Sequence, residues 1–222
     1  MNETSNQLEE DFLKIDTTAG VKEVVLQPNA NAKWQMRVQF PAIELDQYPL
    51  VIALHWAGGG ETFKEYASCL AEPGMQALNA IILSPDAEYQ TWNTPSNELK
   101  ISQLTSLALK HWQVDPEQVI VTGYSNGGNG SWFFAEQYAH LFDYAIPMAS
   151  AYQPSQKIDI PMYVIHGAQD ELFAADRTRD WVESAERMGT NIRWKVAPSL
   201  SHYQACAYVE ELQQAAQWVQ EN

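Results

Sequence analysis

Short apolar runs recur along the chain and are separated by longer amphipathic stretches. The runs occupy residues 50–54, 80–83, 119–122, 144–148 and 162–165, with a further candidate at 192–197. Such runs fit parallel strands that are covered on both faces. Helix-length segments lie between them, at about 62–78, 97–112, 127–140, 173–188 and 204–220. Strands that alternate with helices predict an α/β fold with a mostly parallel central sheet and helices on both faces.

A different pattern precedes these runs. In residues 34–40 the apolar side chains alternate with polar ones, so one face of a strand is buried and the other is wet. Residues 22–27 form a second strand-like run, and Pro28-Asn29 lies in the connection between the two. We therefore expect an N-terminal antiparallel hairpin at an edge of the sheet.

The 222 residues fit one domain. We expect a loosely ordered, polar segment over residues 1–20 and a single α/β domain over residues 21–222. The stretch 149–161 contains two prolines and is too short for an inserted helical cap domain. A site near it is therefore expected to be open or covered only by loops.

Composition and charge limit the classes of binding partner that can be expected. Apolar residues make up 45% of the chain, which supplies a core, and the formal net charge is −15. An acidic surface repels nucleic acids and anionic lipids, and no apolar stretch reaches the length of a membrane span. We therefore expect a small-molecule partner, no nucleic acid and no membrane insertion. The sequence does not predict the oligomeric state.

Cellular location is suggested by the N-terminus and by two cysteines. Met1 to Asp11 is polar and acidic, without the pattern of a signal peptide. Cys69 and Cys206 form neither a metal-binding spacing nor a CxxC pair. The expectation is a cytoplasmic protein with reduced thiols.

The strongest chemical signal is the pentapeptide Gly123-Tyr124-Ser125-Asn126-Gly127. It directly follows an apolar strand and precedes a helical segment, which is the strand–turn–helix context of the G-x-S-x-G nucleophile motif. The glycines admit a sharp turn, and the helix that follows directs its N-terminal amides at the serine. Ser125 is therefore the candidate nucleophile.

A nucleophilic serine needs a base, and the base needs an acid that orients it. Among the five histidines, His202 follows the acid candidate and lies in a late loop between the last strand and the last helix. Asp170 lies just beyond the end of the run 162–165, and Glu171 is its natural rival. The order Ser125, Asp170, His202 is the order expected of α/β-hydrolases.

A glycine-rich loop supplies candidates for an oxyanion hole. His55-Trp56-Ala57-Gly58-Gly59-Gly60 follows the run 50–54, and glycines let backbone amides approach a ligand closely. We expect the amides of Ala57 and Asn126 to be the two donors, with Trp56 as the alternative to Ala57.

Taken together, these motifs resemble those of the α/β-hydrolase superfamily from about residue 20 onward. Within it the chain is similar to small cap-less bacterial esterases of carboxylesterase/phospholipase-like, feruloyl-esterase-like and polyhydroxybutyrate-depolymerase-like types. The matching residues are Leu54-His55 with Gly58–Gly60, Gly123–Gly128, His166-Gly167 with Asp170, and Ser201-His202. Trp56 departs from the pattern, since a glycine is usual there.

The motifs and this resemblance predict a serine esterase, of carboxylesterase type, that acts through an acyl-enzyme without a metal or an organic cofactor. Trp56, Trp92 and Tyr124 are the candidate substrate-binding residues. Two indoles at one site favour short-chain or aromatic esters over long acyl chains. A thioesterase, a peptidase and a catalytically silent binding module on the same fold remain alternatives.

Overall fold

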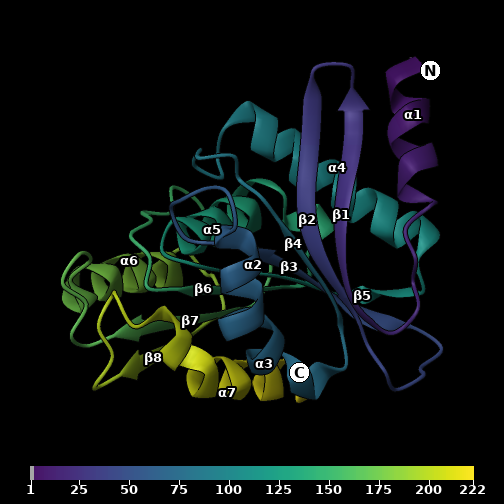
Figure 1. The fold of residues 1–222 in the computed structure, drawn as a ribbon. Helices are drawn as coiled ribbons and strands as arrows, with labels where there is room; N and C mark the ends of the chain where they lie inside the picture. The colour runs from purple at the N-terminus through teal and green to yellow at the C-terminus, as the bar shows by residue number, and fades with distance from the viewer. Residues whose placement is uncertain (1–2) are drawn as a thin grey trace.

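The computed structural model describes residues 3–222 and places an eight-stranded sheet between two layers of helices (Figure 1). The strands are β1 (Gly20–Asn29), β2 (Ala32–Phe40), β3 (Tyr48–Leu54), β4 (Ile81–Pro85), β5 (Val114–Tyr124), β6 (Tyr144–Met148), β7 (Met162–Gly167) and β8 (Ile192–Ala197). The helices are α1 (Glu3–Phe12), α2 (Thr62–Tyr66), α3 (Glu72–Gly74), α4 (Pro95–His111), α5 (Asn126–Gln137), α6 (Ala175–Arg187) and α7 (Val209–Gln220). A π-helical turn, η1 (Ala67–Ala71), and three 3-10 turns, η2 (Gln76–Leu78), η3 (Ala139–Leu141) and η4 (Ala205–Tyr208), complete the elements.

The sheet is parallel except at one edge. Its strand order is β1-β2-β4-β3-β5-β6-β7-β8. Every neighbouring pair from β4-β3 to β7-β8 is parallel. β1 pairs antiparallel with β2, and β2 pairs antiparallel with β4. The predicted mostly parallel sheet with an N-terminal antiparallel edge hairpin is therefore confirmed.

Both faces of the central strands are buried, as the apolar runs predict. In β3, Leu50, Ile52 and Leu54 face a core shared with α1, α4, α5 and α6. Val51 and Ala53 face a second core, shared with α7 and the segment from α2 to η2. This two-sided burial explains why β3 is apolar at every position after Tyr48 and Pro49.

Part of the segment expected to be loosely ordered forms a helix. Residues Glu3–Phe12 form α1, and Leu8 and Phe12, one helical turn apart, are buried on the sheet. The Phe12 ring stacks on Trp112 with ring centroids 4.6 Å apart. For Glu3–Phe12 the expectation is corrected: most positions are polar, but contacts with residues distant in sequence order the segment.

The two cysteines also differ from expectation. Cys69 in η1 and Cys206 in η4 form a disulfide, with Cα atoms 5.2 Å apart and 137 residues between them in sequence. The prediction of reduced thiols is therefore corrected.

The segment 62–78, expected as one helix, is divided into α2, η1, α3 and η2, with Pro73 inside α3.

The topology gathers several loops at one edge of the sheet. Because β3, β5 and β7 are parallel, the segments after Leu54, Tyr124 and Gly167 all emerge there. The stretch 149–161 contains neither helix nor strand, in agreement with the predicted absence of a cap domain. This edge holds the candidate site.

Candidate active site

Ser125 lies on the sharp turn between β5 and α5. Its φ is 56° and its ψ is −114°, a backbone conformation that non-glycine residues rarely adopt. A Cβ atom on Gly123 would lie 2.3 Å from the Gly127 carbonyl oxygen, and one on Gly127 would lie 1.8 Å from that of Leu54. Glycine is therefore required on both sides of the serine for strand and helix to meet this closely.

Three predicted residues form one hydrogen-bonded series. Nε2 of His202 lies 2.8 Å from Oγ of Ser125, and Nδ1 of His202 lies 2.8 Å from Oδ2 of Asp170. The carboxylate can only accept, so Nδ1 carries a proton and Nε2 of the neutral ring is free to accept one from the serine. The arrangement has the geometry of a nucleophile, its base and an orienting acid.

Asp170 is held in its ionised form by the loop around it. Its side chain is fully buried, and Oδ1 accepts hydrogen bonds from the amides of Leu172 and Phe173 at 2.9 and 2.7 Å. Burial acts to raise the pKa of Asp170, but the His202 ring and the Phe173 amide outweigh it. The pKa of this carboxyl therefore lies below its ordinary value of 3.8.

Glu171, the rival acid, has a different partner. Its Oε2 accepts a hydrogen bond from the His202 backbone amide at 3.0 Å, while the imidazole turns to Asp170. Sequence reasoning did not identify this contact, because two adjacent acidic residues after a strand give no signal of which one turns inward. Glu171 thus fixes the loop that carries His202.

Tyr124, the residue before the candidate nucleophile, also contacts the loop that carries His202. Its hydroxyl donates to the His202 carbonyl at 2.8 Å, and its ring packs edge-on against Tyr208. Burial raises the pKa of Tyr124 well above its ordinary value. The disulfide at Cys206, four residues after His202, ties this loop to η1. Neither contact is visible in the local sequence, since both join distant segments.

The expected oxyanion loop follows β3. Ala57 lines the same cleft as Ser125. Neither the Ala57 amide nor the Asn126 amide donates a hydrogen bond to another group within residues 3–222. Donors without another partner are what the expected oxyanion hole needs. The Trp56 side chain lines the same cleft and packs edge-on against Tyr66 and Tyr124.

The cleft has a volume of about 370 Å³ and a largely apolar lining. Trp56, Tyr124 and Leu172 contribute apolar surface beside Ser125 and His202. Tyr203 and Leu172 stand at its rim and are 74% and 53% exposed. Two of the predicted substrate-binding residues, Trp56 and Tyr124, therefore lie in the cleft.

Trp92 does not lie with them, so the expectation that both indoles border one site is corrected. Its indole is 1% exposed and its Nε1 donates to the His55 carbonyl at 2.9 Å. It lines a separate cavity of about 260 Å³ with Asn129 and Tyr152. Trp92 supports the loop after β3, because a buried indole N–H needs an acceptor and the His55 carbonyl provides one.

Among residues 3–222, no group of three or more His, Cys, Asp or Glu side chains is arranged so that it could hold a metal ion. Over the same residues, no helix combines the length and the apolarity needed to span a membrane.

The fold and the turn that carries Ser125 define the α/β-hydrolase superfamily. Residues 38–218 match the dienelactone hydrolase family, and the chain belongs to that family of hydrolases. A curated relative, "Protein usf" of Aquifex pyrophilus, is 28% identical over 91 residues, which is 39% of this chain and 39% of that protein.

Solved structures show the same fold. A thermostable esterase aligns with a TM-score of 0.74 and 21% identity. The alignment covers 90% of this chain but 62% of the esterase, which is the longer chain. A ferulic acid esterase aligns with a TM-score of 0.72 and 17% identity, covering 92% of this chain and 98% of that one. The poly(3-hydroxybutyrate) depolymerase LpqC of Bordetella parapertussis aligns with a TM-score of 0.73 and 14% identity, covering 100% and 96%.

Proposed function

We propose that this chain is a serine esterase that hydrolyses short-chain or aromatic carboxylic esters. The observation that carries the proposal is the hydrogen-bonded series from Asp170 through His202 to Ser125, which ends in an open, largely apolar cleft. Membership of a hydrolase family and the esterases among its structural relatives support the same class of reaction.

In the proposed reaction, Oγ of Ser125 attacks the ester carbonyl carbon while Nε2 of His202 accepts the hydroxyl proton. Asp170 stays ionised and stabilises the imidazolium that forms. The tetrahedral intermediate then expels the alcohol, which takes the proton from Nε2. Water attacks the acyl-enzyme in the same way, and the acid leaves with Ser125 restored.

Negative charge develops on the carbonyl oxygen during both attacks. The amides of Ala57 and Asn126 are the proposed donors to it: Ala57 lines the cleft with Ser125, Asn126 follows Ser125 at the start of α5, and neither amide has a partner within residues 3–222. The N-terminal end of α5 adds to the positive potential at this point.

The cleft lining supports a neutral acyl group of modest size. Glu65 also lines the cleft, which has no lysine or arginine in its lining, so an acyl chain that carries a carboxylate would meet repulsion. The apolar walls suit acetyl, butyryl or aromatic groups. A palmitoyl chain would extend past the exposed rim at Leu172 and Tyr203 into water.

Two measurements test the proposal. A fluorophosphonate probe should label the wild-type protein and fail to label Ser125→Ala, which should fold normally and lose ester hydrolysis. A folded protein that does not label would show a catalytically silent module. A panel of p-nitrophenyl esters of rising chain length, together with a thioester and a peptide, should show preference for short or aromatic esters. Faster cleavage of the thioester or peptide would contradict the substrate class.

The disulfide also bears on the cellular location of the protein. The Cys69–Cys206 disulfide weighs against the cytoplasmic location expected from the sequence, because disulfides persist mainly in oxidising compartments.

A further inference from the structure

Lys100 is a buried lysine close to the candidate site. Its side chain lies on α4 and is 1% exposed. Its ammonium donates to the Asp86 carbonyl at 2.7 Å and pairs with the Glu88 carboxylate. A buried ammonium is costly unless its donors are satisfied, and here both partners belong to one loop, Asp86–Gln90. Lys100 therefore stabilises the conformation of that loop.

The loop has a backbone that needs such support. Glu88 and Tyr89 are consecutive non-glycine residues with φ of 55° and 62°, in the left-handed region. This conformation persists only where the surroundings impose it. The Glu88 amide donates to Oδ1 of Asp86 at 2.9 Å, and Asn97 donates to the Ala87 carbonyl at 3.2 Å. Together with Lys100, these contacts define the loop's shape.

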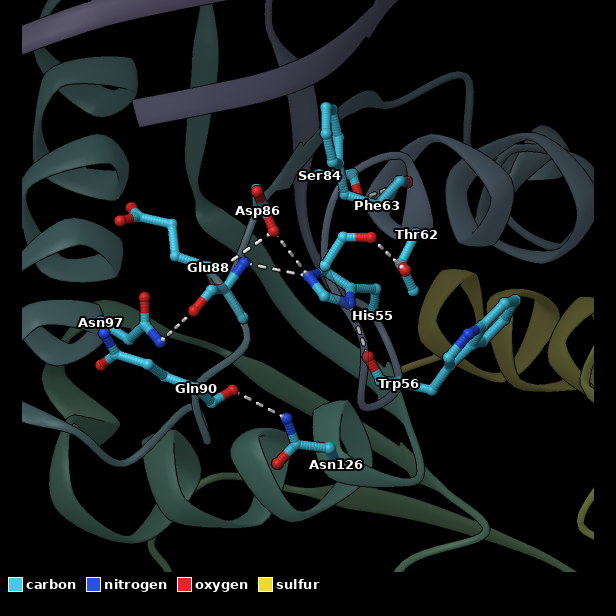
Figure 2. Close-up of polar contacts among 12 residues, drawn as sticks. His55, Trp56, Thr62, Phe63, Ser84, Asp86, Glu88, Gln90, Asn97 and Asn126 are labelled. Atoms are coloured by element: carbon cyan, nitrogen blue, oxygen red, sulfur yellow. Dashed lines mark hydrogen bonds and ion pairs between the residues drawn. The ribbon is translucent and has the colours of Figure 1, made fainter. Parts of the chain in front are cut away.

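One end of the loop orients the first proposed oxyanion donor. Nδ1 of His55 lies 2.6 Å from the Trp56 carbonyl, and Nε2 of His55 accepts from the Ala87 amide at 2.9 Å (Figure 2). The Trp56 carbonyl and the Ala57 N–H belong to the same planar trans peptide and point in opposite directions. A hydrogen bond that fixes the carbonyl therefore also fixes the direction of the Ala57 N–H.

The other end contacts the second donor. The Gln90 carbonyl accepts from Nδ2 of Asn126 at 3.1 Å, as Figure 2 shows. Between the two ends, the Tyr89 ring covers the glycine loop so closely that a Cβ on Gly59 would lie 2.3 Å from it. One loop thus contacts His55, which holds the peptide of the first proposed donor, the Asn126 side chain of the second, and Gly59 in the glycine loop.

We propose that the loop Asp86–Gln90 sets the relative orientation of the Ala57 and Asn126 amides, and that Lys100 is the positioning residue that maintains it. This inference rests on the proposed function and adds the element that keeps the two halves of the oxyanion hole in register. Lys100 itself touches no reacting atom. Its effect should appear in the transition state, where the oxyanion forms, and not in the binding of the ester.

The first test is Lys100→Met, with Lys110→Met as the matched control on the same helix. Lys110 is exposed and pairs with Glu9. We expect kcat for p-nitrophenyl acetate to fall about 10- to 100-fold in Lys100→Met with KM nearly unchanged, less than the loss on deleting an oxyanion donor. The control should match wild type. The affinity of a trifluoromethyl ketone, which forms an anionic adduct with the serine, should fall by the same factor as kcat/KM.

Asn126→Ala keeps its backbone amide and removes the contact with Gln90, and it tests the loop if Lys100→Met does not fold. It should lower kcat several-fold at constant KM. The double variant should lose less than the product of the single losses, because both act through one loop. Unchanged kcat in both single variants, or a loss that appears only in KM, would overturn the inference. Should Ser125→Ala retain wild-type activity, the proposed function itself would fail.

Discussion

Nδ1 of His202 lies 2.8 Å from Oδ2 of Asp170, while the neighbouring Glu171 contacts the His202 backbone amide instead. Two adjacent carboxylates thus hold one histidine at two different atoms. Asp170 contacts the ring that would exchange a proton with Ser125, and Glu171 contacts the main chain that carries the ring. Their substitution should have different consequences.

Asp170→Asn should lower kcat for p-nitrophenyl acetate by roughly 10⁴-fold, because the imidazole loses the partner that sets its tautomer. Glu171→Gln keeps an oxygen acceptor for the His202 amide and should lower kcat by less than about 10-fold. Steady-state kinetics on both variants check this. A larger loss in Glu171→Gln would transfer the orienting role to Glu171.

Removal of the disulfide should destabilise the protein. In a Cys69→Ser/Cys206→Ser double variant, the free energy of unfolding should fall by about 2–5 kcal/mol, because the unfolded chain regains the freedom of a long closed loop. Urea unfolding of wild type with and without a reductant measures it, and the double variant should not respond to the reductant. Equal midpoints for oxidised and reduced wild type would contradict the expectation.

Glu136 should contribute stability that is lost in acid. Burial acts to raise its pKa, but the Tyr152 hydroxyl, the Ser155 amide and hydroxyl, and the Gln156 amide outweigh it, so the folded pKa lies below 4.5. The stabilisation is therefore present above pH 4.5 and disappears as the pH falls through the lower folded value.

Glu136→Gln should thus cost about 1–3 kcal/mol at pH 7 and much less near pH 3. Thermal unfolding at both pH values measures the change, with exposed Glu44→Gln as the control. A difference in Tm between wild type and Glu136→Gln that stays constant over this range would rule out the linkage.

Trp56 should control the choice of acyl chain. Its side chain is half-buried in the wall of the cleft, so Trp56→Ala enlarges the cleft and should raise the relative rate on longer p-nitrophenyl esters. Trp92→Ala is the matched control, since it removes a fully buried indole outside the cleft. It should cost about 3–5 kcal/mol of stability and leave the chain-length profile unchanged. An identical profile in wild type and Trp56→Ala would contradict the assignment.

Local patterns sufficed for much of the fold and the site. The apolar runs predicted the parallel strands, and the Gly123–Gly127 motif predicted the turn at Ser125, because both depend on neighbours in sequence. The pairing of Cys69 with Cys206, the stacking of Phe12 on Trp112 and the burial of Trp92 were not predicted. Each of these is set by segments distant in the chain, and no short-range period encodes it.

The same limit applied to the residues in and around the candidate active site. Ser125, Asp170 and His202 were placed by motif and chain order, and the structure brings them within hydrogen-bond distance. The contact of His55 with Ala87 gave no signal, because a histidine after a strand is compatible with many roles. Likewise, the sequence could not show whether Tyr124 turns its hydroxyl to the substrate or to the His202 carbonyl.

The short segment 149–161 has a chemical consequence beyond access of the substrate. With no cap over Ser125, the proposed acyl-enzyme is open to any dissolved nucleophile that can approach the cleft beside Leu172 and Tyr203. Water and an added alcohol would then compete for the same acyl group, and the ratio of acid to new ester would follow their relative concentrations. For the proposed esterase, the composition of the surrounding solvent would then decide between acid and new ester.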